Sequence, residues 1–267
     1  MEISNSLSVR ESDKRERLLW TLSAATVLIF FQAYMIAPII PHLAQEFRVG
    51  NQIIGLLIPA YMIPYGITSL LFGLVADKVG RKSVMLISLL AMMLLTLLSA
   101  TAQSATQLIG WRLVTGLSAS GTIPQILTLI GELYPYSQRG RPLGWIFGAM
   151  AGGMALGSSF GAILLPAVGW QGLFVGVGIF AGVLFYILWK QRRSIASTKS
   201  KVPFNLKNLL AGYKELLTSR RGARTYGYVF LNGIFHSGIF TKRLGLKPRP
   251  YRTALIHSVK ISCESSL

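Results

Sequence analysis

The sequence contains little charge for its length. Only 13% of its 267 residues are charged and 9 are acidic, whereas 52% are hydrophobic. A soluble globular domain carries about 25% charged residues, so this composition favours a membrane protein. The single cysteine, Cys263, excludes an internal disulfide framework.

Signatures of catalysis and of metal binding are also missing. The chain has no H-E-x-x-H sequence, no paired cysteines and no P-loop, and its histidines are isolated from one another. We therefore predict no catalytic residue, no metal site, no cofactor and no ATP-driven step. An intramembrane enzyme is a weak alternative, because it needs a nucleophile or an acid pair on facing helices.

Positive charge is abundant but unevenly distributed. The formal net charge of +18 would, taken alone, suggest a nucleic-acid-binding protein. Basic residues, however, concentrate after Lys190, where only Glu215 and Glu264 are acidic. Lipid headgroups and membrane topology explain basic residues beside membrane spans. We therefore expect the lipid bilayer, and not nucleic acid, as the partner of these charges.

Long apolar runs occupy most of the chain before Lys190. A bilayer core needs about 20 apolar helical residues to cross it, and irregular backbone cannot face lipid. The runs that meet or approach this length are 18–40, 53–75, 84–102, 108–133, 143–168 and 170–189. They predict an all-α integral membrane protein built on a six-helix bundle, whose first helix is retained because no small-residue cleavage site is evident near its end.

Basic residues in the short loops predict the orientation. With residues 1–17 in the cytoplasm, only Arg48 falls in an outer loop. The pattern favours a multi-pass protein of the plasma (inner) membrane with a cytoplasmic N-terminus. The basic residues then placed inside are Arg10, Lys14, Arg15, Arg17, Lys78, Arg81, Lys82, Arg139, Arg141 and the basic run from Lys190 onward.

The turn between the second and third runs reads GLVADKVGRKSVM, from Gly73 to Met85. Its order of glycine, acid and cations resembles the loop between helices two and three in the major facilitator superfamily of secondary transporters. The segment APIIPHLAQEF, with its two prolines, resembles the drug and proton antiporter branch. RLVTG and GMALGSSFGA resemble the superfamily's intramembrane arginine motif and its glycine-rich antiporter motif, the latter with Ser158 where proline is usual.

The resemblance implies a cytoplasmic latch. Asp77, Arg81 and Glu132 would form a charge cluster that holds the outward-facing state and loosens as the two halves of the transporter rock. Gly73 and Gly80 would allow close helix approach and a tight turn. Lys82 belongs to the same gating motif, although we expect it, like Lys78, chiefly to set topology.

Arg112 lies inside the fourth run, where an isolated cation costs at least about 2.5 kcal/mol. In one interpretation it tunes a proton site or binds an anionic group. In the other its side chain extends to the outer headgroups. The sequence leaves both open.

Glycines of the fifth run follow two rows with a spacing of four residues. Such rows allow close packing of helices in lipid, and packing is the role we predict for them. The two rows are Gly144, Gly148 and Gly152, and Gly153, Gly157 and Gly161.

Polar residues distinguish the first, second and fourth runs from the third and sixth, which we expect to face lipid. Gln32, Tyr34, Tyr61 and Gln125 are candidates to line a substrate cavity. Hydrogen bonding between helices explains them equally well.

The resemblance covers one of the two six-helix halves of the superfamily. We expect 18–189 to be the N-terminal transmembrane domain, 190–223 a basic cytoplasmic linker and 224–240 a partial seventh helix. Residues 241–267 lack a spanning pattern, so we expect a non-native tail produced by frameshift or truncation.

The predicted function is proton-coupled efflux of a small molecule by alternating access. The alternatives are a transport-incompetent fragment or partner-binding membrane protein, and a homodimer that rebuilds the cavity.

Overall fold

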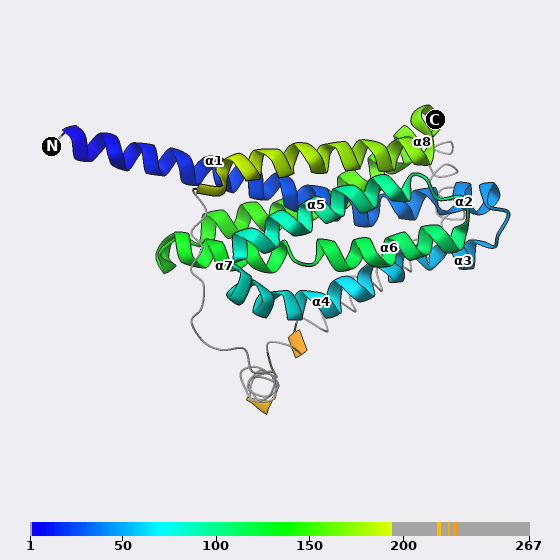
Figure 1. The fold of residues 1–267 in the computed structure, drawn as a ribbon, viewed down its shortest axis with the longest axis horizontal. Coiled ribbons are helices and arrows are strands. Elements are labelled where there is room, and N and C mark those ends of the chain that lie inside the picture. Colours follow the sequence, from blue (N-terminus) through cyan, green and yellow to red (C-terminus); the bar gives the residue numbers. More distant parts are fainter. Residues whose placement is uncertain (1, 194–217, 220–223, 225–226, 229–267) are drawn as a thin grey trace, which may run out of the picture. The chain divides into compact units, whose positions relative to one another are not determined.

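The computed structural model describes residues 2–193, 218–219, 224 and 227–228 (Figure 1). The chain divides into two units, Met1–Val202 and Pro203–Leu267, and nearly all described residues belong to the first. The predicted linker, partial seventh helix and tail lie almost wholly outside the described residues, so these domain boundaries remain predictions.

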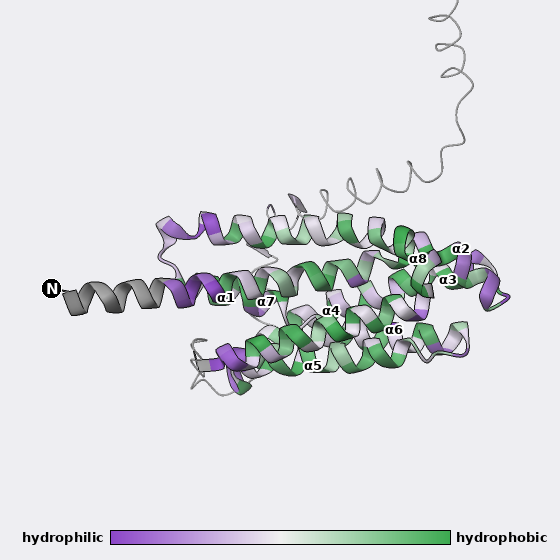
Figure 2. Cartoon of the chain, turned by 90° about the horizontal axis from the view of Figure 1, so that it is seen from above, coloured by the Kyte–Doolittle hydropathy of each residue, from purple (hydrophilic) through white to green (hydrophobic). Residues whose placement is uncertain are grey.

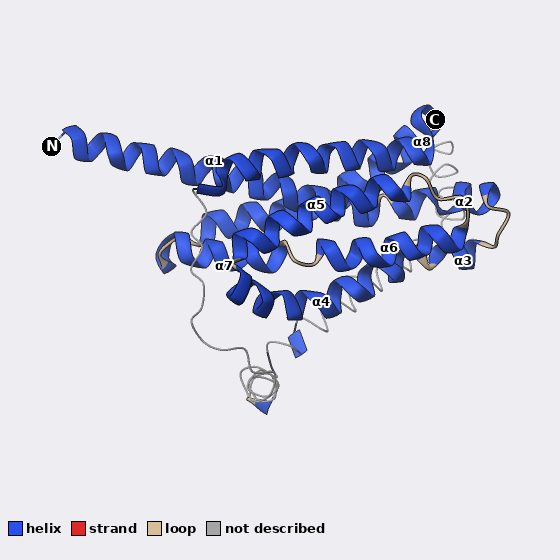
Figure 3. Cartoon of the chain, viewed as in Figure 1, coloured by secondary structure: helices blue, strands red, loops and turns tan. Residues whose placement is uncertain are grey.

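Helices joined by short loops and turns make up the described part of the first unit (Figure 3). Breaks at Met35, at Leu56 and at residues 120–122 divide three longer rods into helix pairs. The α-helices are α1 (Glu2–Tyr34), α2 (Ile36–Glu46), α3 (Asn51–Gly55), α4 (Leu57–Val79), α5 (Arg81–Ser99), α6 (Ala105–Ala119), α7 (Ile123–Leu133) and α8 (Gly140–Lys190). Short 3-10 turns, Tyr136–Gln138 and Gln191–Arg193, precede and follow α8.

Five described segments are long and apolar enough to cross a membrane: Asp13–Glu46, Asn51–Gly73, Arg81–Ser99, Ala105–Leu133 and Gly140–Lys190. The last has 51 residues, which as a straight helix would measure about 75 Å, more than twice the thickness of a bilayer core. A single crossing therefore cannot account for its length.

Gly169 divides α8 into two arms. Its φ of 68° and ψ of 173° are not helical. The start of α8 and the residue directly after its end both meet the middle of α1: Arg141 Nη1 donates to Glu16 Oε1 at 2.7 Å, and Gln191 Nε2 donates to Thr21 Oγ1 at 3.0 Å. The chain therefore reverses at Gly169, and the arms provide the fifth and sixth predicted crossings.

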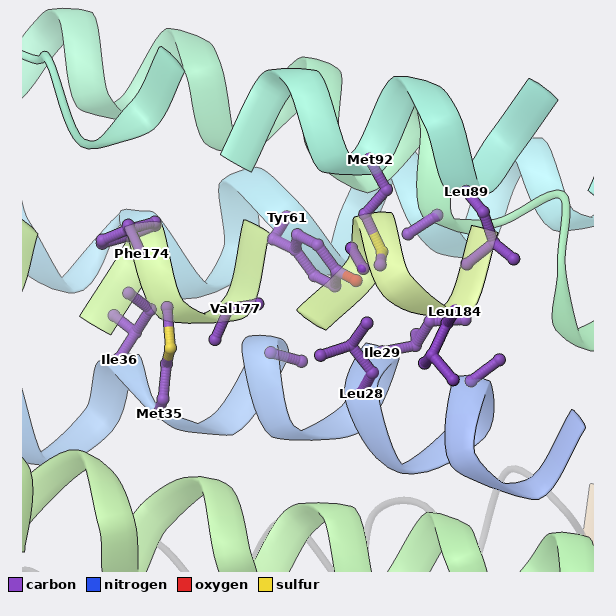
Figure 4. Close-up of a cluster of buried hydrophobic side chains, with 14 of the residues drawn as sticks. Leu28, Ile29, Met35, Ile36, Tyr61, Leu89, Met92, Phe174, Val177 and Leu184 are labelled. Carbon is purple, nitrogen blue, oxygen red and sulfur yellow. The ribbon is translucent and has the colours of Figure 1, made fainter. Parts of the chain in front are cut away.

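The α1 helix packs along α8, α5 packs on both α8 and α6, and α4 packs on α6 (Figure 1). Tyr61 of α4, Leu89 of α5 and Phe174 of α8 lie in the core that these helices enclose (Figure 4). Because α1, α4, α5, α6 and α8 all contribute residues to it, the core holds the helices in one bundle rather than in separate pairs.

The lateral surface is apolar, and hydrophilic residues gather at the two ends of the rods (Figure 2). Large aliphatic side chains are more than half exposed there, including Ile63, Ile87, Ile163 and Ile179. Such a surface suits lipid and not water. In the most apolar part of Asn51–Gly73, 17% is buried, compared with 39% in that of Arg81–Ser99. The expectation that the third and sixth runs face lipid stays a prediction.

Candidate functional site

The turn between α4 and α5 depends on Gly80. Its φ of 100° lies in a region that favours glycine. The turn places Asp77 in the last turn of α4 and Arg81 at the first position of α5. A four-residue separation thus brings an acid and a cation together across a helix junction.

Arg81 joins three helices. Its Nη1 donates to Glu132 Oε1 near the end of α7, and its Nη2 lies 3.3 Å from Asp77 Oδ1. The Arg81 side chain is 18% exposed, whereas those of Asp77 and Glu132 are 47% and 34% exposed. The structure therefore brings together the three residues of the predicted charge cluster.

Two other residues of this motif lie outside the cluster. Within the described residues, Lys82 pairs with neither Asp77 nor Glu132. A Cβ added to Gly73 would meet open space among the described residues, so the predicted close helix approach at Gly73 stays a prediction.

A second ion pair lies at the same end of the bundle. Arg141 donates to both carboxylate oxygens of Glu16, at 2.7 and 3.3 Å, and so ties α8 to α1. Tyr134 lies beside this pair, where partial burial, and secondarily the charge of Glu16, raise the pKa of its hydroxyl. Sequence reasoning missed this contact. In the sequence, Glu16 lies just before the first expected span and Arg141 just before the fifth. Charged residues at the start of a span are too common for this pattern to predict a specific pair.

Arg112 is fully buried on α6. Its Nη2 donates to the backbone oxygen of Gln32 at 3.2 Å, and its guanidinium carbon lies 4.6 Å from the centroid of the Tyr61 ring. The alternative in which this side chain reaches the outer headgroups is therefore wrong. Among the described residues, its Nε and Nη1 have no hydrogen-bond partner.

Gly116 follows Arg112 by one helical turn and faces the same partner. A Cβ on Gly116 would overlap the backbone oxygen of Tyr61. Residues four apart lie on one face of a helix, so both ends of the RLVTG motif contact Tyr61 on α4. The arginine contacts the ring, and the glycine allows the backbones to approach.

Of the four cavity candidates, three lie inside the bundle. Gln32 Nε2 donates to Thr96 Oγ1 at 2.6 Å, and Gln125 Nε2 donates to the backbone oxygen of Phe72 at 3.1 Å. Tyr61 is 1% exposed. These contacts favour interhelical hydrogen bonding over cavity lining for Gln32 and Gln125. Tyr34 is partly exposed, and its place in a cavity stays a prediction.

Among the helices that the structure describes, only one glycine row of α8 packs against another helix. A Cβ on Gly153, Gly157 or Gly161 would come within 2.5, 2.5 or 2.7 Å of a backbone oxygen of the rod formed by α1 and its continuation. A Cβ on Gly148 or Gly152 would meet open space. No described helix packs against Gly148 or Gly152, so a packing role for these two glycines stays a prediction.

A pocket of about 350 Å³ lies between α1 and the two arms of α8. Its lining is apolar and includes Val27, Phe31, Leu164 and Phe180. The pocket therefore suits a hydrocarbon group rather than a polar ligand. The described part of the chain contains no group of three or more His, Cys, Asp or Glu side chains that could hold a metal ion.

The chain resembles known transporters over part of their length. The gallate transporter of Pseudomonas putida is 30% identical over 166 residues, which cover 61% of this chain and 37% of the transporter. Multidrug resistance protein 3 of Bacillus subtilis is 31% identical over 145 residues, which cover 54% of this chain and 28% of that protein. This chain thus spans well under half of both relatives.

A solved structure shows the same fold. The crystal structure of a bacterial homologue of the human lysosomal transporter Spinster, inward-facing and unoccupied, matches with a TM-score of 0.63 at 20% identity. The match covers 76% of this chain and 48% of that one. The family model of the Major Facilitator Superfamily matches residues 22–248, a range that includes nearly all six membrane crossings. This multi-pass membrane protein therefore belongs to the Major Facilitator Superfamily.

Proposed function

We propose that the chain is the N-terminal six-helix domain of a secondary active transporter in the plasma membrane, with its N-terminus in the cytoplasm. The transporter moves a small molecule by alternating access, and a proton gradient drives efflux. No enzymatic step is involved.

The observation that carries this proposal is the bridge from Arg81 to Asp77 and Glu132. The bridge ties the turn between α4 and α5 to the end of α7. Partly exposed ion pairs contribute about 0.2–1 kcal/mol, which changes a two-state equilibrium by a factor of up to about 5. A contact of this strength biases one state and still breaks during each transport cycle.

The relatives support a small organic substrate. Two of them are a gallate transporter and a multidrug resistance protein, and another is the 4-hydroxybenzoate transporter PcaK of Acinetobacter baylyi, 30% identical over 176 residues. The chain aligns with 38% of this last protein, so the complete substrate path would include surfaces beyond this domain.

A flux assay tests the proposal. The full chain is reconstituted into liposomes with a pH gradient, and uptake of labelled gallate or of the dye ethidium is followed. The mass of the protein in detergent is measured in parallel. Flux that a protonophore abolishes supports proton-coupled transport, and flux by a dimeric species indicates that two copies form the cavity.

Silent vesicles with a monomeric protein would contradict transport by this chain. They would favour the second candidate function, a transport-incompetent or partner-binding membrane protein. The short alignment with the relatives, 28% to 38% of their lengths for these three, is the observation behind that candidate.

A further inference from the structure

We propose that the substrate site to which this domain contributes selects organic anions through Arg112. Aromatic carboxylates are the ligands that we expect it to bind most tightly. The inference rests on the proposed transport function and specifies the substrate class. It comes from the charge distribution inside the bundle and from the unpaired donors of one side chain.

Arg112 is the one charged residue in the interior of the described spans. The described Asp, Glu, Lys and other Arg residues between Leu18 and Lys190 lie at or near helix ends or in the connecting turns. Arg112 lies seven residues into α6, about 10 Å along the helix axis from its start. The interior of this domain is therefore positive, and no acid within it offsets the charge.

The ion pairs of the described residues do not include Arg112. They include the pairs of His42 with Glu46, of Arg81 with Asp77 and Glu132, and of Arg141 with Glu16. An isolated charge in a low-dielectric interior acts strongly on a second charge that enters it. An anion that enters gains this attraction, and a cation meets repulsion.

The hydrogen-bonding groups of Arg112 also fit an anion. Its Nη2 donates to the Gln32 backbone oxygen at 3.2 Å, but its buried Nε and Nη1 have no partner among the described residues. A buried donor without a partner costs about 1–3 kcal/mol. The planar guanidinium presents its remaining donors in a geometry that suits the two oxygens of a carboxylate.

Aromatic rings cover this cation. The Tyr61 ring lies 4.6 Å from the guanidinium carbon, and Tyr65 stacks on Tyr61 with centroids 6.1 Å apart and an interplanar angle of 13°. Tyr65 is partly exposed, whereas Tyr61 is buried. A shift of this tyrosine pair would open Arg112 to a ligand and place an aromatic ring of that ligand against Tyr65.

Three ligands of nearly equal size test the inference: benzoate, benzyl alcohol and benzylammonium. Binding of each to the full chain in neutral detergent is measured by calorimetry at pH 7. We expect benzoate to bind at least tenfold more tightly than benzylammonium, with benzyl alcohol between them. Benzylammonium binding as tight as benzoate binding, or no benzoate binding, would overturn the inference.

Substitutions at Arg112 and Arg48 distinguish an effect of the Arg112 charge on binding from an effect on folding. We expect Arg112→Gln to weaken benzoate binding about tenfold or more and to reduce the difference in affinity between benzoate and benzylammonium, while an unchanged circular dichroism spectrum shows that the variant is still folded. Arg112→Lys keeps the charge without the planar donors, so it should retain part of the preference for benzoate. Arg48→Gln removes an exposed cation and should leave all three affinities unchanged. An Arg112→Gln variant that binds benzoate like the wild type contradicts the proposal.

Flux distinguishes this inference from the proposed function. If benzoate binds as expected but vesicles show no flux, transport is wrong and anion selection stands. If vesicles transport ethidium and exclude benzoate, transport stands and anion selection is wrong.

Discussion

Arg112 on α6 stacks over the ring of Tyr61 on α4, with its guanidinium carbon 4.6 Å from the ring centroid. A contact of this kind between desolvated groups contributes up to about 2 kcal/mol or more. It joins α4 to α6 and keeps the charge of Arg112 inside the bundle, away from lipid. It also leaves the Tyr61 hydroxyl without a hydrogen-bond partner among the described residues.

The first prediction concerns Tyr61. Tyr61→Leu removes the ring that faces Arg112 and should lower stability by about 2–4 kcal/mol, because the cation–π contact and aromatic packing are both lost. Tyr61→Phe keeps the ring and removes only an unpartnered hydroxyl, so it should be neutral or slightly stabilising. Unfolding by SDS in mixed micelles measures both. Equal losses in the two variants would contradict the role of the ring.

The second prediction concerns the bridge at the α4–α5 turn. A double-mutant cycle of Arg81→Gln and Glu132→Gln should give a coupling energy of about 0.5–1 kcal/mol, since the pair is partly exposed. The matched cycle of Lys82→Gln and Glu132→Gln should give a value near zero. The same unfolding assay at low and high salt measures the coupling, which should fall as salt screens the charges. Equal coupling in both cycles would exclude a specific bridge.

The third prediction compares two glycines of one helix. A methyl group on Gly157 would come within 2.5 Å of the Phe31 backbone oxygen, so Gly157→Ala should cost about 1–3 kcal/mol through overpacking. Gly148→Ala enters open space and should stabilise the helix by about 0.5–1 kcal/mol. The melting temperatures in detergent should therefore move in opposite directions. A shift of both in the same direction would mean that the two rows do not differ in packing.

The fourth prediction concerns the reversal in α8. Gly169 has a φ of 68°, where a side chain costs about 1–2 kcal/mol, so Gly169→Ala should lower the melting temperature. Gly176 lies in the second arm, and a Cβ there would meet open space. Gly176→Ala should therefore leave the melting temperature unchanged or raise it. Helix content from circular dichroism should stay near the wild-type value in both variants. An unchanged melting temperature for Gly169→Ala would argue against a fixed turn there.

The fifth prediction tests orientation. In a Cys263→Ser background, Ser137→Cys and Asn51→Cys place single thiols at opposite ends of the rods. A membrane-impermeant maleimide should label Asn51→Cys on intact cells and Ser137→Cys only after permeabilisation. The reverse pattern would invert the proposed topology and place the Arg81 bridge outside the cell.

The crossings were predictable from the sequence because the bilayer demands about 20 apolar residues per helix, whatever those helices pack against. The break between 168 and 170 was predictable for the same reason, and Gly169 occupies it. The cluster of Asp77, Arg81 and Glu132 followed from the resemblance of its turn to a known motif. The crossings and the break depend on run length and the Asp77–Arg81 pair on a four-residue spacing, whereas the contact of Arg81 with Glu132, 51 residues away in the chain, was expected only from the resemblance.

Side-chain directions depended on the tertiary structure. Two glycine rows with equal spacing look alike in the sequence, and the rotation of α8 about its axis decides that Gly157 meets α1 while Gly148 does not. The same holds for Arg112, whose position on α6 allowed either an outward or an inward side chain until Tyr61 and Gln32 were placed beside it. Local composition determines which segments enter the membrane, but only the packing of one helix against another determines which face of each is buried.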